Sequence, residues 1–169
     1  LLAGVLIVES LVLLASAAWR MSLYVGAYGL SFKRLVTYWG MGMMALFFLA
    51  ALWKLLRTDR SFCRLAFPIA LAGWVLLNCV PLDALVARDQ VDRVLSGETA
   101  VLDVEYLLED LSYDTLPQLA RLDGSRSVYT QEGKTTLEAL LTQRRSEARA
   151  ECSDWRAWNL SAWRAGTDS

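Results

Sequence analysis

Three long stretches of the chain contain almost no charge, and all of them lie in its first half. Residues 1–19 are apolar except for Glu9, Ser10 and Ser16, whereas residues 35–53 and 65–82 carry no charged side chain. A helix rises about 1.5 Å per residue, so each stretch covers most of a hydrocarbon core roughly 30 Å thick. The pattern predicts three transmembrane helices, at about residues 1–20, 35–53 and 65–82.

The first stretch has a second interpretation, as a secretory signal peptide. A signal peptide needs a basic region before its apolar segment, and no basic residue precedes this one. The chain opens inside the apolar stretch, at Leu1. We therefore expect a true span, with further residues before Leu1.

Beyond residue 82 the apolar residues recur at helical spacing in short segments separated by polar ones. No segment alternates with period two, so we expect no strand, and residues 125–134 are predicted to be a loop. Thr135 and Glu138 have the spacing of a capping box, and Ser153 is positioned to cap the last helix. Short helices are expected at residues 83–95, 102–111, 114–122, 136–152 and 154–164.

The predicted fold is therefore all-α, with three transmembrane helices (residues 1–82) followed by a small, acidic, helical extramembrane tail (residues 83–169). The first helix is expected to continue to Tyr28, with Gly29 after its C-terminus and Ser31 as the next N-cap. Pro81 lies where the third span should end.

Charge separates the same two halves. Residues 1–82 contain seven Lys and Arg and two acidic residues, a net charge of +5. Residues 83–169 contain ten Lys and Arg and sixteen acidic residues, a net charge of −6. Short basic loops favour the cytoplasm, and four of the eleven residues at 54–64 are basic. We expect this loop to be cytoplasmic and the tail to lie on the outer, periplasmic side.

The composition argues against several kinds of chemistry. The chain has no His, which removes the usual general base and the commonest metal ligand. Its three Cys are widely separated, so we expect no metal site, and a disulfide between Cys79 and Cys152 stays an open alternative. The acidic tail and scattered glycines do not suit a nucleic acid or a phosphate-binding loop. We expect neither a cofactor nor an enzyme.

Two polar residues lie within the predicted spans. Glu9 could be an intramembrane proton or cation relay. It could instead form a hydrogen bond to a partner helix, or lie at a shallow depth if the helix starts before Leu1. We favour these simpler interpretations because no second ionisable residue accompanies Glu9 in the spans. Asn78 also has two interpretations. Its side chain could form a hydrogen bond to another helix, or it could cap the turn before Pro81, which we favour.

Three tryptophans, Trp155, Trp158 and Trp163, lie within nine residues near the end of the tail. The simpler interpretation, which we favour, is that they cover the tail's small core. The alternative is an anchor against a partner or the membrane interface, since aromatic residues concentrate at both.

Four segments, LYVGAYGLSFKR, LLNCVPLDALVAR, LDVEYLLEDLSYDTLPQLARL and DWRAWNLSAWRA, occur in this order. Over about residues 11–165 the chain resembles the C-terminal part of bacterial multi-pass membrane proteins grouped as domain of unknown function 4153 and its relative 4173. The resemblance implies an integral bacterial membrane protein and no reaction. It places the family pattern in the hairpin and at the exit of the third span on Tyr24, Tyr28, Gly29, Leu30, Arg34, Asn78, Pro81, Asp83, Ala84 and Arg88, and in the tail on Leu102, Asp103, Tyr106, Leu107, Pro117, Trp155, Trp158, Asn159 and Leu160.

The chain departs from that family in two ways. Family members are usually much longer, with several more spans before this region. At the exit of the third span we expect Asn-Pro-Asp, whereas here Asn78, Pro81 and Asp83 are separated by other residues.

We therefore expect a non-catalytic membrane subunit that scaffolds or stabilises a larger complex in the bacterial inner membrane. Its partners would be the lipid bilayer and other membrane subunits, and a photosynthetic or respiratory host fits equally well. The alternative is a fragment of a transporter or signalling protein that uses Glu9 as its relay.

Overall fold

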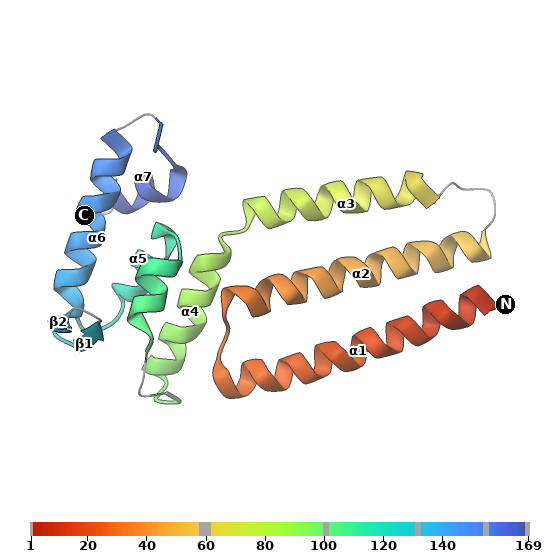
Figure 1. Ribbon diagram of the computed structural model, residues 1–169, viewed down its shortest axis with the longest axis horizontal. Coiled ribbons are helices and arrows are strands. Elements are labelled where there is room, and N and C mark those ends of the chain that lie inside the picture. Colours follow the sequence, from red (N-terminus) through yellow and green to blue (C-terminus); the bar gives the residue numbers. More distant parts are fainter. Residues whose placement is uncertain (1, 58–61, 100–101, 131–132, 154–155, 168–169) are drawn as a thin grey trace. The chain divides into compact units, whose positions relative to one another are not determined.

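Three long helices make up the first part of the chain, and shorter elements follow them (Figure 1). The computed structural model describes residues 2–57, 62–99, 102–130, 133–153 and 156–167. Their contacts divide the chain into two units, Leu1–Leu82 and Asp83–Ser169.

The first unit consists of α1 (Leu2–Tyr28), α2 (Phe32–Leu56) and α3 (Phe62–Cys79). Each is long and apolar enough to cross a membrane, which confirms the three predicted spans. With 27 and 25 residues, α1 and α2 extend beyond the apolar stretches. The third helix ends three residues earlier than expected, because the residue before a proline is disfavoured in a helix and Val80 precedes Pro81.

Within this unit α2 packs against both α1 and α3, so the three helices lie side by side (Figure 1). At one contact, a Cβ added to Gly73 of α3 would collide with the thioether of Met43 on α2. At another, a Cβ on Gly4 of α1 would lie 3.2 Å from Cδ2 of Leu55. Small residues thus allow close approach at both interfaces, as is typical of membrane helices.

The turn between α1 and α2 is built as expected. Gly29 follows the last residue of α1 with a φ of 76°, a left-handed conformation that favours glycine. Ser31 occupies the N-cap position of α2, although its hydroxyl makes no capping hydrogen bond.

The second unit is mainly helical, as predicted. Its elements are α4 (Leu82–Leu95), a π-helical turn η1 (Tyr106–Asp110), a 3₁₀ turn η2 (Tyr113–Thr115), α5 (Leu116–Leu119), β1 (Ser127–Thr130), β2 (Gly133–Thr136), α6 (Leu137–Ser153) and α7 (Leu160–Thr167). The largest fully buried side chains come from five of these elements: Val86, Val91, Leu107, Thr115, Leu116, Leu119 and Leu137. Burying each Leu or Val contributes roughly 1.5–3 kcal/mol, so this shared core is what holds such short elements together.

The middle of this unit is less regular than the sequence pattern predicts. The helix expected at 102–111 is reduced to a short segment that ends in η1, and the one at 114–122 to η2 and the four-residue α5. Buried Thr115 explains part of the difference. Its hydroxyl lies 3.0 Å from the carbonyl oxygen of Leu107 and 3.1 Å from that of Ser112, so it satisfies backbone groups that a longer helix would pair itself.

The prediction that no strand would occur was wrong for one short segment. β1 and β2 pair antiparallel, with Val128 opposite Thr135 and Ser127 opposite Thr136. Thr135 is therefore a strand residue and not part of a helix cap. The strands are rich in β-branched residues, and buried Val128 fixes the hairpin on the core, a signal too short for a pattern of alternation to detect.

The last helix begins later than predicted. The hydroxyl of Ser153 donates to the carbonyl oxygen of Ala150 on its own helix, at 2.6 Å, and so does not cap the following one. Asn159 takes that role, since its Oδ1 accepts the backbone N–H of Ala162 at 2.8 Å.

Candidate functional site

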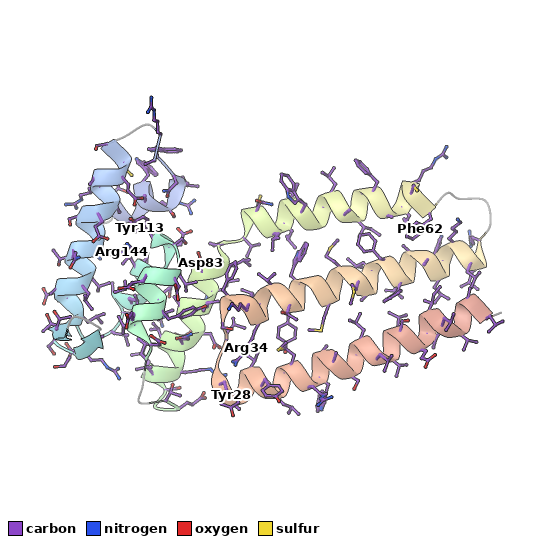
Figure 2. The ribbon with its side chains drawn as sticks, viewed as in Figure 1. Tyr28, Arg34, Phe62, Asp83, Tyr113 and Arg144 are labelled. Atoms are coloured by element: carbon purple, nitrogen blue, oxygen red, sulfur yellow. The ribbon has the colours of Figure 1, made fainter. Side chains whose placement is uncertain are left out.

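The hairpin positions of the family pattern lie together at the α1–α2 turn (Figure 2). Arg34 donates from Nη1 to the carbonyl oxygen of Gly29 at 2.6 Å, and its guanidinium lies 5.7 Å from the centroid of the Tyr28 ring. The rings of Tyr24 and Tyr28 stack with centroids 6.3 Å apart. Gly29 is buried, so Arg34 satisfies a carbonyl that the end of α1 leaves unpaired. These four residues hold the turn closed.

The residues at the exit of the third span do not form one cluster. Asn78 donates from Nδ2 to the carbonyl oxygen of Trp74 at 2.7 Å, so its amide serves its own helix. Asp83 accepts the backbone N–H of Ser112 at 3.0 Å and ties the start of α4 to the segment before η2. Arg88 is exposed and pairs with Asp92 one turn later, at 3.6 Å. Pro81 separates α3 from α4.

A second carboxyl lies near this tie. Burial raises the pKa of the Asp114 carboxyl, Arg164 on α7 opposes the rise, and the negative charge of Asp83 adds to it. The ionised Asp114 is therefore attracted by Arg164 on α7 and repelled by Asp83 on α4.

Glu9 and Asn78, the two intramembrane polar residues, are not brought together. Glu9 is exposed on α1, about 28 Å along the helix axis from the turn at Gly29. Asn78 lies near the end of α3, on the same side of the bundle as that turn (Figure 1). Among the described residues no hydrogen bond or ion pair joins Glu9 to another side chain. The two do not form a joint site.

Two of the three tryptophans near the chain end, Trp158 and Trp163, are less buried than the interpretation we favoured requires. Trp158 and Trp163 are 52% and 49% exposed, and Leu160 between them is 50% exposed. Buried Ala162 and Ala165 form the inner face of α7 instead. Trp155 lies outside the described residues. We call Leu160 and Trp163 of α7, together with Trp158 two residues before the helix begins, the outer face of α7.

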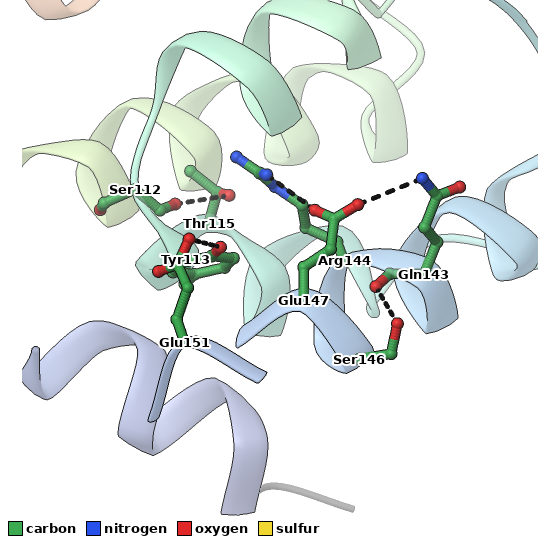
Figure 3. A network of polar contacts seen from close by, with 8 residues as sticks. All are labelled: Ser112, Tyr113, Thr115, Gln143, Arg144, Ser146, Glu147 and Glu151. Atoms are coloured by element: carbon green, nitrogen blue, oxygen red, sulfur yellow. Dashed lines mark hydrogen bonds and ion pairs between the residues drawn. The ribbon is translucent and has the colours of Figure 1, made fainter. Parts of the chain in front are cut away.

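A polar cluster joins η2 to α6 (Figure 3). The hydroxyl of buried Tyr113 donates to Oε1 of Glu151 at 2.9 Å, and the guanidinium of Arg144 lies 4.8 Å from the centre of the Tyr113 ring. Arg144 also pairs with Glu147 at 2.9 Å, and Gln143 donates to the same carboxylate at 3.1 Å.

Sequence reasoning missed this cluster. The spacing of Arg144, Glu147 and Glu151 places them on one face of a helix, a signal that was available. Their partner Tyr113 is far away in sequence and carried no signal.

The electrostatics of the cluster are those of a structural contact. Burial, followed by the hydrogen bond to Glu151, raises the pKa of Tyr113 from 10.0 to about 12. The hydrogen bond from Arg144 lowers the pKa of Glu147, against a smaller opposing effect of burial. Tyr113 therefore keeps its proton at neutral pH and acts as a hydrogen-bond donor, and Glu147 is fully ionised beside its arginine. Arg144 matches the charge of Glu147, and Glu151 accepts the hydrogen bond of the neutral Tyr113 hydroxyl.

These observations define a membrane-embedded protein with three apolar helices and a separate, mainly helical unit. Within the described ranges, no three carboxylate or thiol side chains gather in a way that could hold a metal ion. The chain belongs to the family described as Domain of unknown function (DUF4153), whose sequence model matches residues 1–122. The match includes the hairpin and the exit of the third span, and it ends before α6 and α7. No curated protein and no solved structure matches the chain.

Proposed function

We propose that this protein is a non-catalytic subunit that stabilises a larger complex in the inner membrane of a bacterium. In this proposal α1–α3 hold it in the bilayer, its tail lies on the periplasmic side, and the outer face of α7 contacts a neighbouring subunit.

The outer face of α7 is the observation that carries the proposal. In a water-soluble unit an amphipathic helix normally turns its largest apolar side chains inward. α7 does the reverse, because Ala162 and Ala165 are buried while Leu160 and Trp163 are about half exposed, as is Trp158 just before the helix. Tryptophan dominates the binding energy of many protein interfaces. A helix that buries alanine and exposes tryptophan is suited to bind a second protein.

The membrane helices support the same proposal. In the most apolar window of each helix only 0–6% of the residues are buried inside the structure. Gly26 on α1 and Gly40 and Gly42 on α2 have nothing within 4 Å of where a Cβ would lie. Such open glycines let the backbone of another helix approach closely. A complex with further membrane helices would use these surfaces.

The test compares two double variants of the full chain in its native membrane. Trp158→Gln with Trp163→Gln removes the outer face of α7, and Leu85→Gln with Leu95→Gln removes two exposed apolar residues from α4 as the matched control. After mild extraction, native gels and cross-linking measure the mass of the assembly that contains the 18.9 kDa chain. Loss of two hot-spot residues should reduce the assembled fraction by about tenfold or more.

We expect the control pair to assemble like the wild type, and helical circular dichroism to be retained in both pairs. The proposal is wrong if the wild-type chain is released as a free monomer. It is also wrong if the tryptophan pair assembles normally.

Glu9→Gln distinguishes this proposal from the transport alternative. A relay needs further polar groups along the membrane, and Glu9 and Asn78 lie far apart on different helices. We therefore expect Glu9→Gln to leave both the assembly and the proton permeability of membrane vesicles unchanged. Loss of proton or ion coupling in a variant that still assembles would favour transport.

A further inference from the structure

A cavity of about 890 Å³ lies between α2 and α3, at the end of these helices away from the Gly29 turn. Its volume falls in the range of about 300–1,000 Å³ that is typical of small-molecule sites. None of the residues discussed above as candidate sites lines it.

The rim of this cavity is positively charged. Lys54, Arg57 and Arg64 line it, and no acidic side chain does so among the described residues. None of the three forms an ion pair with another residue that the structure describes. Arg57 instead lies over the ring of Trp53, with its guanidinium carbon 5.5 Å from the ring centroid. Among the described residues, therefore, no carboxylate matches the charge of these three cations.

The start of α3 adds to this positive potential. α3 begins at Phe62 beside the cavity, so the positive end of its helix dipole is close to the rim.

Below the rim the wall is apolar. Leu46 lies eight residues before Lys54, so the lining follows α2 for about 12 Å into the membrane-spanning part of the helix. Leu46, Leu49 and Trp53 are each about half exposed there, and Ile69 lines the α3 side. A charged rim above an apolar wall matches a molecule with an anionic head and a hydrocarbon body.

We propose that this cavity is a binding site for an anionic phospholipid. Lys54, Arg57 and Arg64 bind the phosphate, and the upper part of an acyl chain lies along Leu46 and Leu49. Basic pockets between membrane helices bind anionic headgroups in this way. Inorganic phosphate would contact the rim alone and leave the apolar wall unused, which is why the structure favours a lipid.

Lipid binding to the full chain in detergent tests the site, with native mass spectrometry to count bound molecules. The probes are palmitoyl-oleoyl phosphatidylglycerol, phosphatidylcholine with the same chains, and inorganic phosphate as a competitor. We expect one phosphatidylglycerol molecule to be retained at concentrations where phosphatidylcholine is not. Phosphate at the same concentration should not displace it.

Two matched pairs of substitutions locate the site. Arg57→Gln with Arg64→Gln removes two charges from the rim, and Arg20→Gln with Lys33→Gln removes two at the opposite end of the bundle. At about fivefold per cation, removal of two rim cations should weaken phosphatidylglycerol binding about 30-fold. The control pair should change it less than about threefold.

Leu49→Trp fills part of the apolar wall without changing any charge, and it should weaken phosphatidylglycerol binding if an acyl chain occupies that wall. This variant also decides the question if the rim pair fails to give a monodisperse, helical protein. Equal weakening by both charge pairs, or equal retention of phosphatidylcholine, would overturn the proposal. Displacement by phosphate with no effect of Leu49→Trp would reduce the site to an ion site and also overturn it.

Discussion

At the residue scale, most side chains that suggest chemistry in this protein serve the fold. Arg34 closes the α1–α2 turn through the carbonyl oxygen of Gly29, and Asp83 holds the backbone of Ser112. Asn78 bonds within its own helix. A buried or terminal backbone group that lacks a partner costs about 1–3 kcal/mol, so a polar side chain that supplies one is valuable without taking part in a reaction.

Tyr113 gives a prediction for high pH. Its pKa is about 12 in the folded chain and near 10 in an unfolded one, so the unfolded state loses this proton first as the pH rises. The stability that this group contributes is complete below pH 10 and is lost as the pH rises to about 12. Absorbance at 295 nm should therefore show one of the six tyrosines titrating later than an ordinary tyrosine.

Tyr113→Phe should remove that late step, together with the corresponding part of the stability loss between pH 10 and 12. It should also lower the free energy of unfolding at neutral pH by about 1 kcal/mol, because Glu151 loses its donor. A late step that persists in Tyr113→Phe would assign it to another tyrosine.

At the element scale, the first unit depends on how closely its helices approach. Gly73 is buried against Met43, whereas Gly42 faces open space on the neighbouring helix. The same residue type therefore has different roles on α3 and on α2, according to whether another helix lies opposite it.

Gly73→Ala and Gly42→Ala make a matched pair. Alanine favours a helix over glycine by up to about 1 kcal/mol at both sites, so the difference between the variants reports packing alone. Because the flexible thioether of Met43 can move only partly aside, Gly73→Ala should be about 1–3 kcal/mol less stable than Gly42→Ala. Unfolding by sodium dodecyl sulfate in mixed micelles measures this difference in the free energy of unfolding.

Met43→Ala in the Gly73→Ala background should recover part of that loss, since it removes the colliding group. Equal stability of the two glycine variants would mean that α2 and α3 do not pack through Gly73.

At the scale of the whole molecule, Cys63 and Cys79 lie at the two ends of α3, which is long and apolar enough to cross a membrane. All three cysteines are free, and Cys63 and Cys79 are exposed. In the proposed arrangement α3 is the last span among the described helices, and the α2–α3 end of the bundle and the second unit would then lie on opposite sides of the bilayer.

Two single-cysteine variants test this arrangement and the proposed orientation. With the other two cysteines replaced by Ser, a membrane-impermeant maleimide applied to intact cells should label Cys152 and leave Cys63 unlabelled. Inverted vesicles should reverse the result. Labelling of Cys63 alone in intact cells would place the tail in the cytoplasm, and labelling of both from one side would contradict the three-span arrangement.

The sequence by itself determined the three spans, the Gly29 turn, the break at Pro81 and the helical character of the tail. These features depend on hydrocarbon thickness, helical periodicity and the backbone limits of Gly and Pro, all of which act over a few neighbouring residues. Only the tertiary structure decided that Gly73 and not Gly42 meets a neighbouring helix, and that α7 turns its alanines inward. It also paired Tyr113 with Glu151, which is 38 residues away. Such choices depend on which elements pack together, and a local pattern contains no information about a partner that is distant in sequence.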